Sequence, residues 1–99
     1  MTKAKTKPWN VQDHLKTEEE CRLFLEAAFE DAGEDPAYLA QAIGEVARAQ
    51  GMTRVARKAG LAREALYRSL SRDGNPELGT VLKVLHAFGL QLTTKKLAA

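Results

Sequence analysis

The sequence predicts an all-α domain built from five short helices. Apolar residues recur every three or four positions through most of the chain, a spacing that places them on one face of a helix. Residues that favour helix starts precede these stretches, and glycines follow them. The 99 residues are enough for one domain with one core. We expect this domain to span residues 9–94, between a disordered basic arm at residues 1–8 and a tail at residues 95–99.

The first two helices have clear start signals. Thr17 and Glu20 form a capping box, in which each side chain accepts a hydrogen bond from a backbone amide at the start of the helix. Asp35 and Pro36 open the second helix, because aspartate accepts from the free amides and proline fits the first helical position. We expect Gly33 and Gly51 to end these two helices.

The remaining helices are shorter, and turn residues separate them. We expect helices over residues 53–60, 62–71 and 76–89, the last of them capped by Asn75 and started by Pro76. Residues 90–93 alternate apolar and polar side chains, which is typical of a short strand. Residues 9–16 are ambiguous, and one interpretation is an extended segment that packs on the domain through Trp9, Val11 and Leu15.

Charge is divided unequally along the chain. Residues 17–47 hold nine acids and one base, whereas residues 48–74 hold seven bases and two acids. This separation indicates one face that meets a polyanion and another face that is kept away from it. Two solvated helix faces of opposite sign are the alternative interpretation.

The sequence shows no sign of a membrane-spanning segment or of a catalytic site. No stretch is apolar enough to span a bilayer and no secretory signal is present, so we expect a cytoplasmic protein. Cys21, the single cysteine, lies on an apolar helix face, where we expect a buried thiol. His14 and His86 lie far apart without a third ligand, and no nucleophile has a base beside it. We therefore expect no metal, no cofactor and no catalytic activity.

Residues 52–72 carry the pattern of a helix-turn-helix unit, in which two short helices cross at a steep angle. Such a unit needs a small residue where the helices approach, and Ala56 meets this need. It also needs a residue that tolerates a left-handed backbone at the turn, where Gly60 lies. The other expected core positions of the unit are Val55, Leu61, Leu66 and Leu70.

The second helix of this unit presents long polar side chains outward. We expect Arg63, Glu64 and Tyr67 to contact bases, since arginine fits guanine edges, glutamate accepts from cytosine, and tyrosine stacks. The residues expected to position the DNA backbone are Thr53, Arg54, Arg57, Arg68 and Arg72. A solvated helix face with paired charges is the alternative.

Several of these stretches resemble the addiction-module antidote family, the HigA-like antitoxins of type II toxin–antitoxin modules. The resemblance covers residues 9–92, and its most specific motifs are Gly74-Asn75-Pro76 and Arg63-Glu64-Ala65-Leu66-Tyr67. Ala62 is a departure, because related chains commonly carry serine there as the N-cap of the recognition helix. Alanine cannot cap, so a phosphate contact from a hydroxyl would be absent.

The resemblance implies a lambda-repressor-like fold and a bacterial protein with two kinds of partner. As a homodimer, the protein would bind a palindromic operator in its own promoter, and it would neutralise a RelE/ParE-like toxin. The acidic run Glu18, Glu19 and Glu20 is a candidate surface for a basic toxin, and the last helix or residues 90–93 for the dimer contact. Two alternatives stay open: a phage-type regulator without a toxin, and a toxin-binding protein with vestigial DNA contacts.

Overall fold

The computed structural model describes residues 11–71 and 73–98, and this part of the chain is all-α, as predicted. The predicted arm at residues 1–8 and Trp9 lie outside the described residues. No helix in the described ranges is long and apolar enough to cross a membrane. The elements are the 3-10 helix η1 (Val11–His14) and the α-helices α1 (Glu18–Ala32), α2 (Pro36–Gln50), α3 (Met52–Ala59), α4 (Arg63–Ser69) and α5 (Leu78–Ala87).

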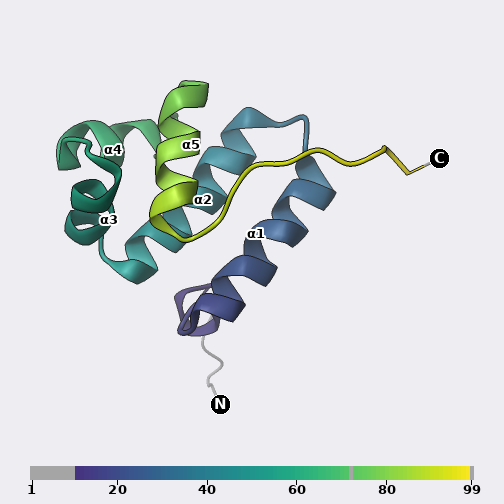
Figure 1. The fold of residues 1–99 in the computed structure, drawn as a ribbon, viewed down its shortest axis with the longest axis horizontal. Coiled ribbons are helices and arrows are strands. Elements are labelled where there is room, and N and C mark those ends of the chain that lie inside the picture. Colours follow the sequence, from purple (N-terminus) through teal and green to yellow (C-terminus); the bar gives the residue numbers. More distant parts are fainter. Residues whose placement is uncertain (1–10, 72, 99) are drawn as a thin grey trace, which may run out of the picture.

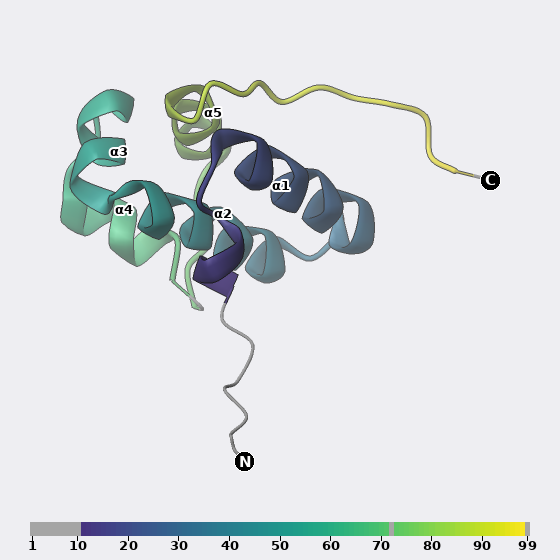
Figure 2. The ribbon, with the colours of Figure 1, turned by 90° about the horizontal axis from the view of Figure 1, so that it is seen from below.

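The helices are arranged around α2. In Figure 1, α1 and α5 lie in front of α2, and the short helices α3 and α4 gather at one end of the molecule. Figure 2, turned by a right angle, shows the same separation of α1 and α5 from α2. Helix α3 contacts α2, α4 and α5, and α1 contacts α2. This arrangement, with a short helix pair at one end, is consistent with a helix-turn-helix domain.

A single apolar core joins all five helices. Helix α1 contributes Leu25 to this core, and the segment before it contributes Leu15. The segment packs on the domain as expected, but residues 11–14 form the 3-10 helix η1 and not an extended strand-like stretch. Because every helix has side chains in this core, the core fixes the position of α3 and α4. The largest fully buried side chains are Ile43, Val46, Val55, Leu66, Leu70 and Val84.

The caps predicted for the first two helices are confirmed. The Thr17 hydroxyl accepts from the Glu20 amide at 3.0 Å, and the Glu20 carboxylate accepts from the Thr17 amide at 3.0 Å. The Asp35 carboxylate accepts from the amides of Ala37 and Tyr38 at 3.1 and 3.2 Å. These bonds satisfy amides that have no partner inside a helix.

The predicted start of the last helix is wrong by two residues. Helix α5 begins at Leu78, and its N-cap is Glu77, which makes no side-chain capping bond. The chain first passes over the end of α4, where Gly74 lies so close that a Cβ would clash with the Ser69 carbonyl. Residues 75–77 then carry the chain across to α5, so Asn75 and Pro76 belong to this connection. The boundaries of α3 and α4 differ from the prediction by one or two residues.

The strand predicted at residues 90–93 is also wrong. Residues 90–98 follow α5 without regular structure, and the described part of the chain offers them no strand to pair with. Their alternating pattern alone cannot make a strand, because a strand needs the hydrogen bonds of a neighbour. An ion pair between Lys95 and Glu30 links this segment to α1.

Candidate nucleic-acid interface

Helices α3 and α4 are joined by a tight turn at residues 60–62. Gly60 has φ +71° and ψ +33°, a left-handed conformation that glycine adopts at little cost. The Leu61 amide donates to the Ala56 carbonyl at 2.9 Å, which closes the end of α3. The turn therefore forces α4 into a new direction immediately after α3 ends.

The side chains between α3 and α4 are apolar and buried. Ala56 is 3% exposed, so the two helices approach closely at this point. Leu61 is half-buried and packs against the core from the turn. Val55, Leu66 and Leu70 are each 1% exposed or less. The orientation of α4 is thus set by its own buried face, which leaves the opposite face to solvent.

The exposed face of α4 brings four of the predicted side chains together. Arg63, Glu64, Tyr67 and Arg68 surround one shallow, open depression. Tyr67 is 50% exposed, so half of its surface is open to another molecule. In the described part of the chain, Glu64 forms no ion pair with either arginine. These groups are therefore available as donors and acceptors for another molecule.

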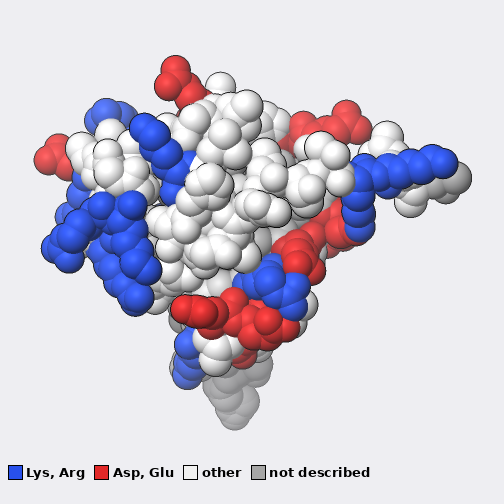
Figure 3. Space-filling view, in the orientation of Figure 1, with Lys and Arg blue, Asp and Glu red and all other residues white. Residues whose placement is uncertain are grey.

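Helix α3 adds a second set of exposed polar groups. Thr53, Arg54 and Arg57 are exposed, and Figure 3 shows lysine and arginine gathered over α3 and α4. Lys58, which the sequence analysis did not single out, is exposed one turn after Arg54. Its spacing of four residues from Arg54 was the signal that could have identified it. The predicted contact residue Arg72 lies outside the described residues.

The start of α3 has free backbone donors. Its N-cap is Gly51, at φ +99°, and no side chain caps this end. The Gly51 amide donates to the Arg48 carbonyl of α2 at 3.2 Å, and within α3 the first amide that bonds back is that of Val55, which donates to the Gly51 carbonyl at 2.9 Å. The preceding amides of α3 carry the positive end of the helix dipole. Together with Arg54, they form a place that favours an anionic oxygen.

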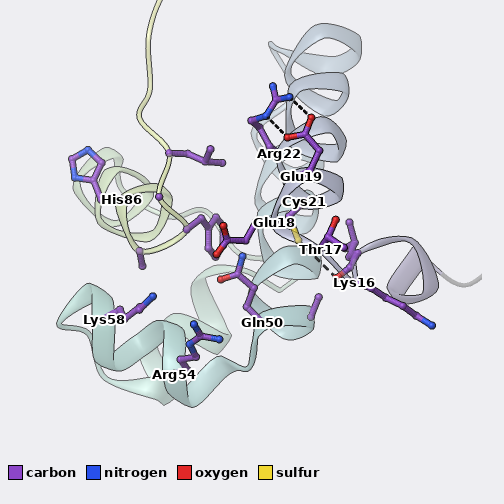
Figure 4. Close-up of a pocket in the computed structure, with 16 residues that line it drawn as sticks. Lys16, Thr17, Glu18, Glu19, Cys21, Arg22, Gln50, Arg54, Lys58 and His86 are labelled. Carbon is purple, nitrogen blue, oxygen red and sulfur yellow. Dashed lines mark hydrogen bonds and ion pairs between the residues drawn. The ribbon is translucent and has the colours of Figure 1, made fainter.

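A cleft of about 550 Å³ lies beside this basic face, between the start of α1 and the ends of α2 and α5. Arg54 and Lys58 lie on one side of it, and Glu18 on the other (Figure 4). Cys21 lies at its base, only 3% exposed, and burial raises the pKa of its thiol. The expected buried thiol is therefore confirmed. No three potential metal ligands come together within the described residues.

Helix α1 carries the opposite charge on its outer side. Arg22 pairs with Glu19 at 2.6 Å and with Glu26 at 2.5 Å, and the hydrogen bond to Arg22 lowers the pKa of Glu19. One arginine cannot balance the acids of this helix, so an acidic stripe runs along α1 in Figure 3. Three glutamates at the start of α1 were expected to offer a surface to a basic toxin. Of these, Glu20 accepts hydrogen bonds in the helix cap and Glu19 pairs with Arg22.

Comparison with known proteins covers almost the whole chain. Residues 5–96 match the family described as "Probable addiction module antidote protein". A protein of Haemophilus influenzae, described as an uncharacterized protein, is 39% identical over 90 residues, which are 91% of each of the two chains. No solved structure matches the chain.

Proposed function

Because the chain belongs to the addiction module antidote family, and so has a toxin as partner, we propose that it is an antitoxin that also binds DNA and represses its own promoter. The observation that carries the DNA-binding part is the face of α4 with four exposed polar side chains around one depression. In this proposal the protein is a bacterial cytoplasmic homodimer that acts by binding and catalyses nothing.

Helix α4 enters the major groove of the operator. Arg63 donates to a guanine edge, Glu64 accepts from a cytosine amino group, and Tyr67 stacks on a base or sugar. A matched pair of this kind discriminates against a wrong base by about 1–3 kcal/mol. In a homodimer on a palindrome, two such helices lie about 34 Å apart, one turn of the duplex.

Helix α3 holds the phosphate backbone. Its free amides and Thr53 meet one phosphate, and Arg54 and Arg57 add charge-assisted hydrogen bonds. Lys58 extends this set, since it is exposed on the same short helix. From α4, Arg68 supplies a further phosphate contact. These contacts fix the register of α4 in the groove and make the affinity depend on salt.

The toxin that the chain neutralises in this proposal is a RelE/ParE-like protein. The resemblance of the chain to HigA-like antitoxins supports this class. The acidic side of α1 suits a basic toxin. Its start lies near the basic group over α3, whereas the rest of it runs away from α3 and α4 in Figures 1 and 3. A toxin bound there leaves α4 accessible to DNA, so one protein serves both partners.

The test separates the two activities in one cell. The chain is expressed with the small protein encoded beside its gene, and with a reporter placed behind the DNA upstream of the gene. Arg63→Ala should release repression by roughly tenfold or more, as expected for the loss of one base contact. It should still prevent growth arrest. Lys96→Ala removes the same charge from an exposed site at the far end of the chain and should retain both activities.

Each other outcome removes a part of the proposal. Full repression by Arg63→Ala excludes this residue from base contacts. Rescue of growth by a wild-type chain that represses nothing identifies a toxin-binding protein with vestigial DNA contacts. Repression without rescue identifies a DNA-binding regulator that does not neutralise the neighbouring protein.

A further inference from the structure

Leu23 is exposed on the side of α1 that faces away from the core. It is 50% exposed and does not belong to the apolar core, which α1 builds with Leu25 and Ala28 among others. By helical spacing, Leu23 lies roughly opposite these two residues, where an amphipathic helix carries polar side chains. A single exposed leucine is common on protein surfaces, so its surroundings decide whether it has a role.

The surroundings of Leu23 on the helix surface are almost entirely acidic. The side chains three and four positions away, which are its neighbours on a helix, are those of Glu19, Glu20, Glu26 and Ala27. Three of these four neighbours are carboxylates, and the fourth is a single methyl group that is also exposed. Leu23 and Ala27 therefore form a small apolar centre inside an acidic rim. An apolar centre surrounded by polar residues is the typical composition of a protein–protein interface.

The carboxylates around this centre have too few partners within the chain. Arg22 pairs with both Glu19 and Glu26, and the side chains of these two glutamates are still 64% and 59% exposed. Glu30 follows Glu26 at a spacing of four residues, at which like charges repel each other. Cations from another molecule would therefore be stabilised on this side of α1.

Glu30 shows what such a carboxylate accepts. The Lys95 ammonium group lies 2.5 Å from the Glu30 carboxylate, although 65 positions of the sequence separate the two residues. The two side chains are 77% and 54% exposed, so this ion pair is weak and exchangeable. A lysine of another protein can replace Lys95 here without the loss of any buried contact.

Charge selects the occupant of this surface. DNA and an anionic membrane carry the same sign as the rim, and two copies of the chain that met through it would bring two acidic rims together. The same surface on the basic α3–α4 face of another copy would form an open chain of molecules, because such a contact is not symmetric. A basic protein of a different kind is the partner that fits.

We propose that Leu23, Ala27 and the carboxylates of Glu19, Glu26 and Glu30 form the surface on which the toxin docks. Leu23 enters an apolar recess of the toxin, and lysine or arginine side chains of the toxin meet the rim. The choice of occupant rests on the proposed function, in which the chain neutralises a basic toxin. The apolar anchor adds specificity, because carboxylates alone attract any basic molecule.

Isothermal titration calorimetry of the full chain with the purified small protein encoded beside its gene tests the proposal. Leu23→Ala should weaken the complex at least tenfold, because the anchor loses most of its apolar contact. Leu92→Ala is the matched control, since Leu92 is 41% exposed beyond α5, and it should bind like the wild type. Far-UV circular dichroism in urea should show both variants to be as stable as the wild type.

Further variants separate the anchor from the rim. Ala27→Arg places a long cation beside Leu23 at an exposed position, so this variant should fold and yet bind at least tenfold more weakly. Glu26→Gln should weaken the complex several-fold at low salt and much less at high salt, whereas Leu23→Ala should weaken it at both. Lys95→Ala frees Glu30 and should bind at least as tightly as the wild type.

The outcomes distinguish this surface from the proposed function. Wild-type affinity of the folded Leu23→Ala and Ala27→Arg variants, or weaker binding by Lys95→Ala, would overturn the docking surface and leave the toxin as a partner. A wild-type chain that does not bind the neighbouring protein would remove the toxin from the proposed function, and this occupant with it. If Leu23→Ala changed the mass of the chain alone in sedimentation equilibrium, the occupant would be another copy, which also overturns the proposal.

Discussion

The contact between α2 and the end of α4 gives the sharpest test of what positions the exposed face of α4. Gly44 lies in the middle of α2, and a Cβ there would lie 2.5 Å from the Leu70 carbonyl oxygen and 3.3 Å from the Leu70 Cβ. The carbonyl belongs to the backbone and cannot rotate away. In Gly44→Ala, the end of α4 must therefore move away from α2, and the exposed face of α4 moves with it.

Two opposing effects set the size of this change. Alanine favours an α-helix over glycine by about 1 kcal/mol, which stabilises the variant. An extra methyl group in a well-packed interior costs about 1–3 kcal/mol, and a rigid partner at this distance places the cost at the upper end. The expected result is a free energy of unfolding that is lower by about 1–2 kcal/mol.

Urea denaturation, followed by far-UV circular dichroism at one protein concentration, measures this difference. Gln41, exposed on the same helix, provides the control. The difference between Gln41→Gly and Gln41→Ala gives the propensity effect alone, and alanine should be more stable by about 1 kcal/mol. If Gly44→Ala is as stable as the wild type or more stable, the close contact between α2 and Leu70 is not as described.

Three further predictions concern other parts of the molecule. Gly60→Ala should lower the free energy of unfolding by about 1–2 kcal/mol, because its φ of +71° is unfavourable for alanine; equal stability in urea would contradict the left-handed turn. Thr17→Ala should cost about 1 kcal/mol through the lost cap, whereas Thr17→Ser should unfold near the wild-type midpoint. The Cys21 thiol should react with Ellman's reagent far more slowly in the folded protein than in urea. Since burial raises its pKa in the folded state, stability should also fall as the pH rises above about 8.5, and Cys21→Ala should remove this slope.

The parts of the fold that follow from neighbouring residues could be predicted from the sequence. The caps at Thr17 and Asp35 depend on side chains and amides two or three positions apart, and the structure forms them as expected. The left-handed turn at Gly60 depends on one residue and its two flanking helices. Local hydrogen bonds and backbone freedom decide these features, so a pattern in the sequence is sufficient to identify them.

Features that depend on distant residues could not be predicted in this way. The start of α5 is set by the passage of Gly74 over the Ser69 carbonyl, which no cap pattern contains. Residues 90–93 have the alternation of a strand but no neighbour in the described chain. For the candidate site, the exposed positions on α4 could be inferred from helical spacing. The cleft beside Lys58 could not, because it forms only where the start of α1 and the ends of α2 and α5 meet α3.

The measurement that tests the central proposal most directly is fluorescence anisotropy with the duplex upstream of the gene and a scrambled duplex of the same composition. Both are titrated with wild type and Arg63→Ala at several salt concentrations. We expect the wild type to prefer the native duplex by about 10³-fold or more, with an affinity that falls steeply with salt. Arg63→Ala should lose about 1–3 kcal/mol on the native duplex and much less on the scrambled one. Equal, weak binding of the wild type to both duplexes would contradict sequence-specific DNA binding by this protein.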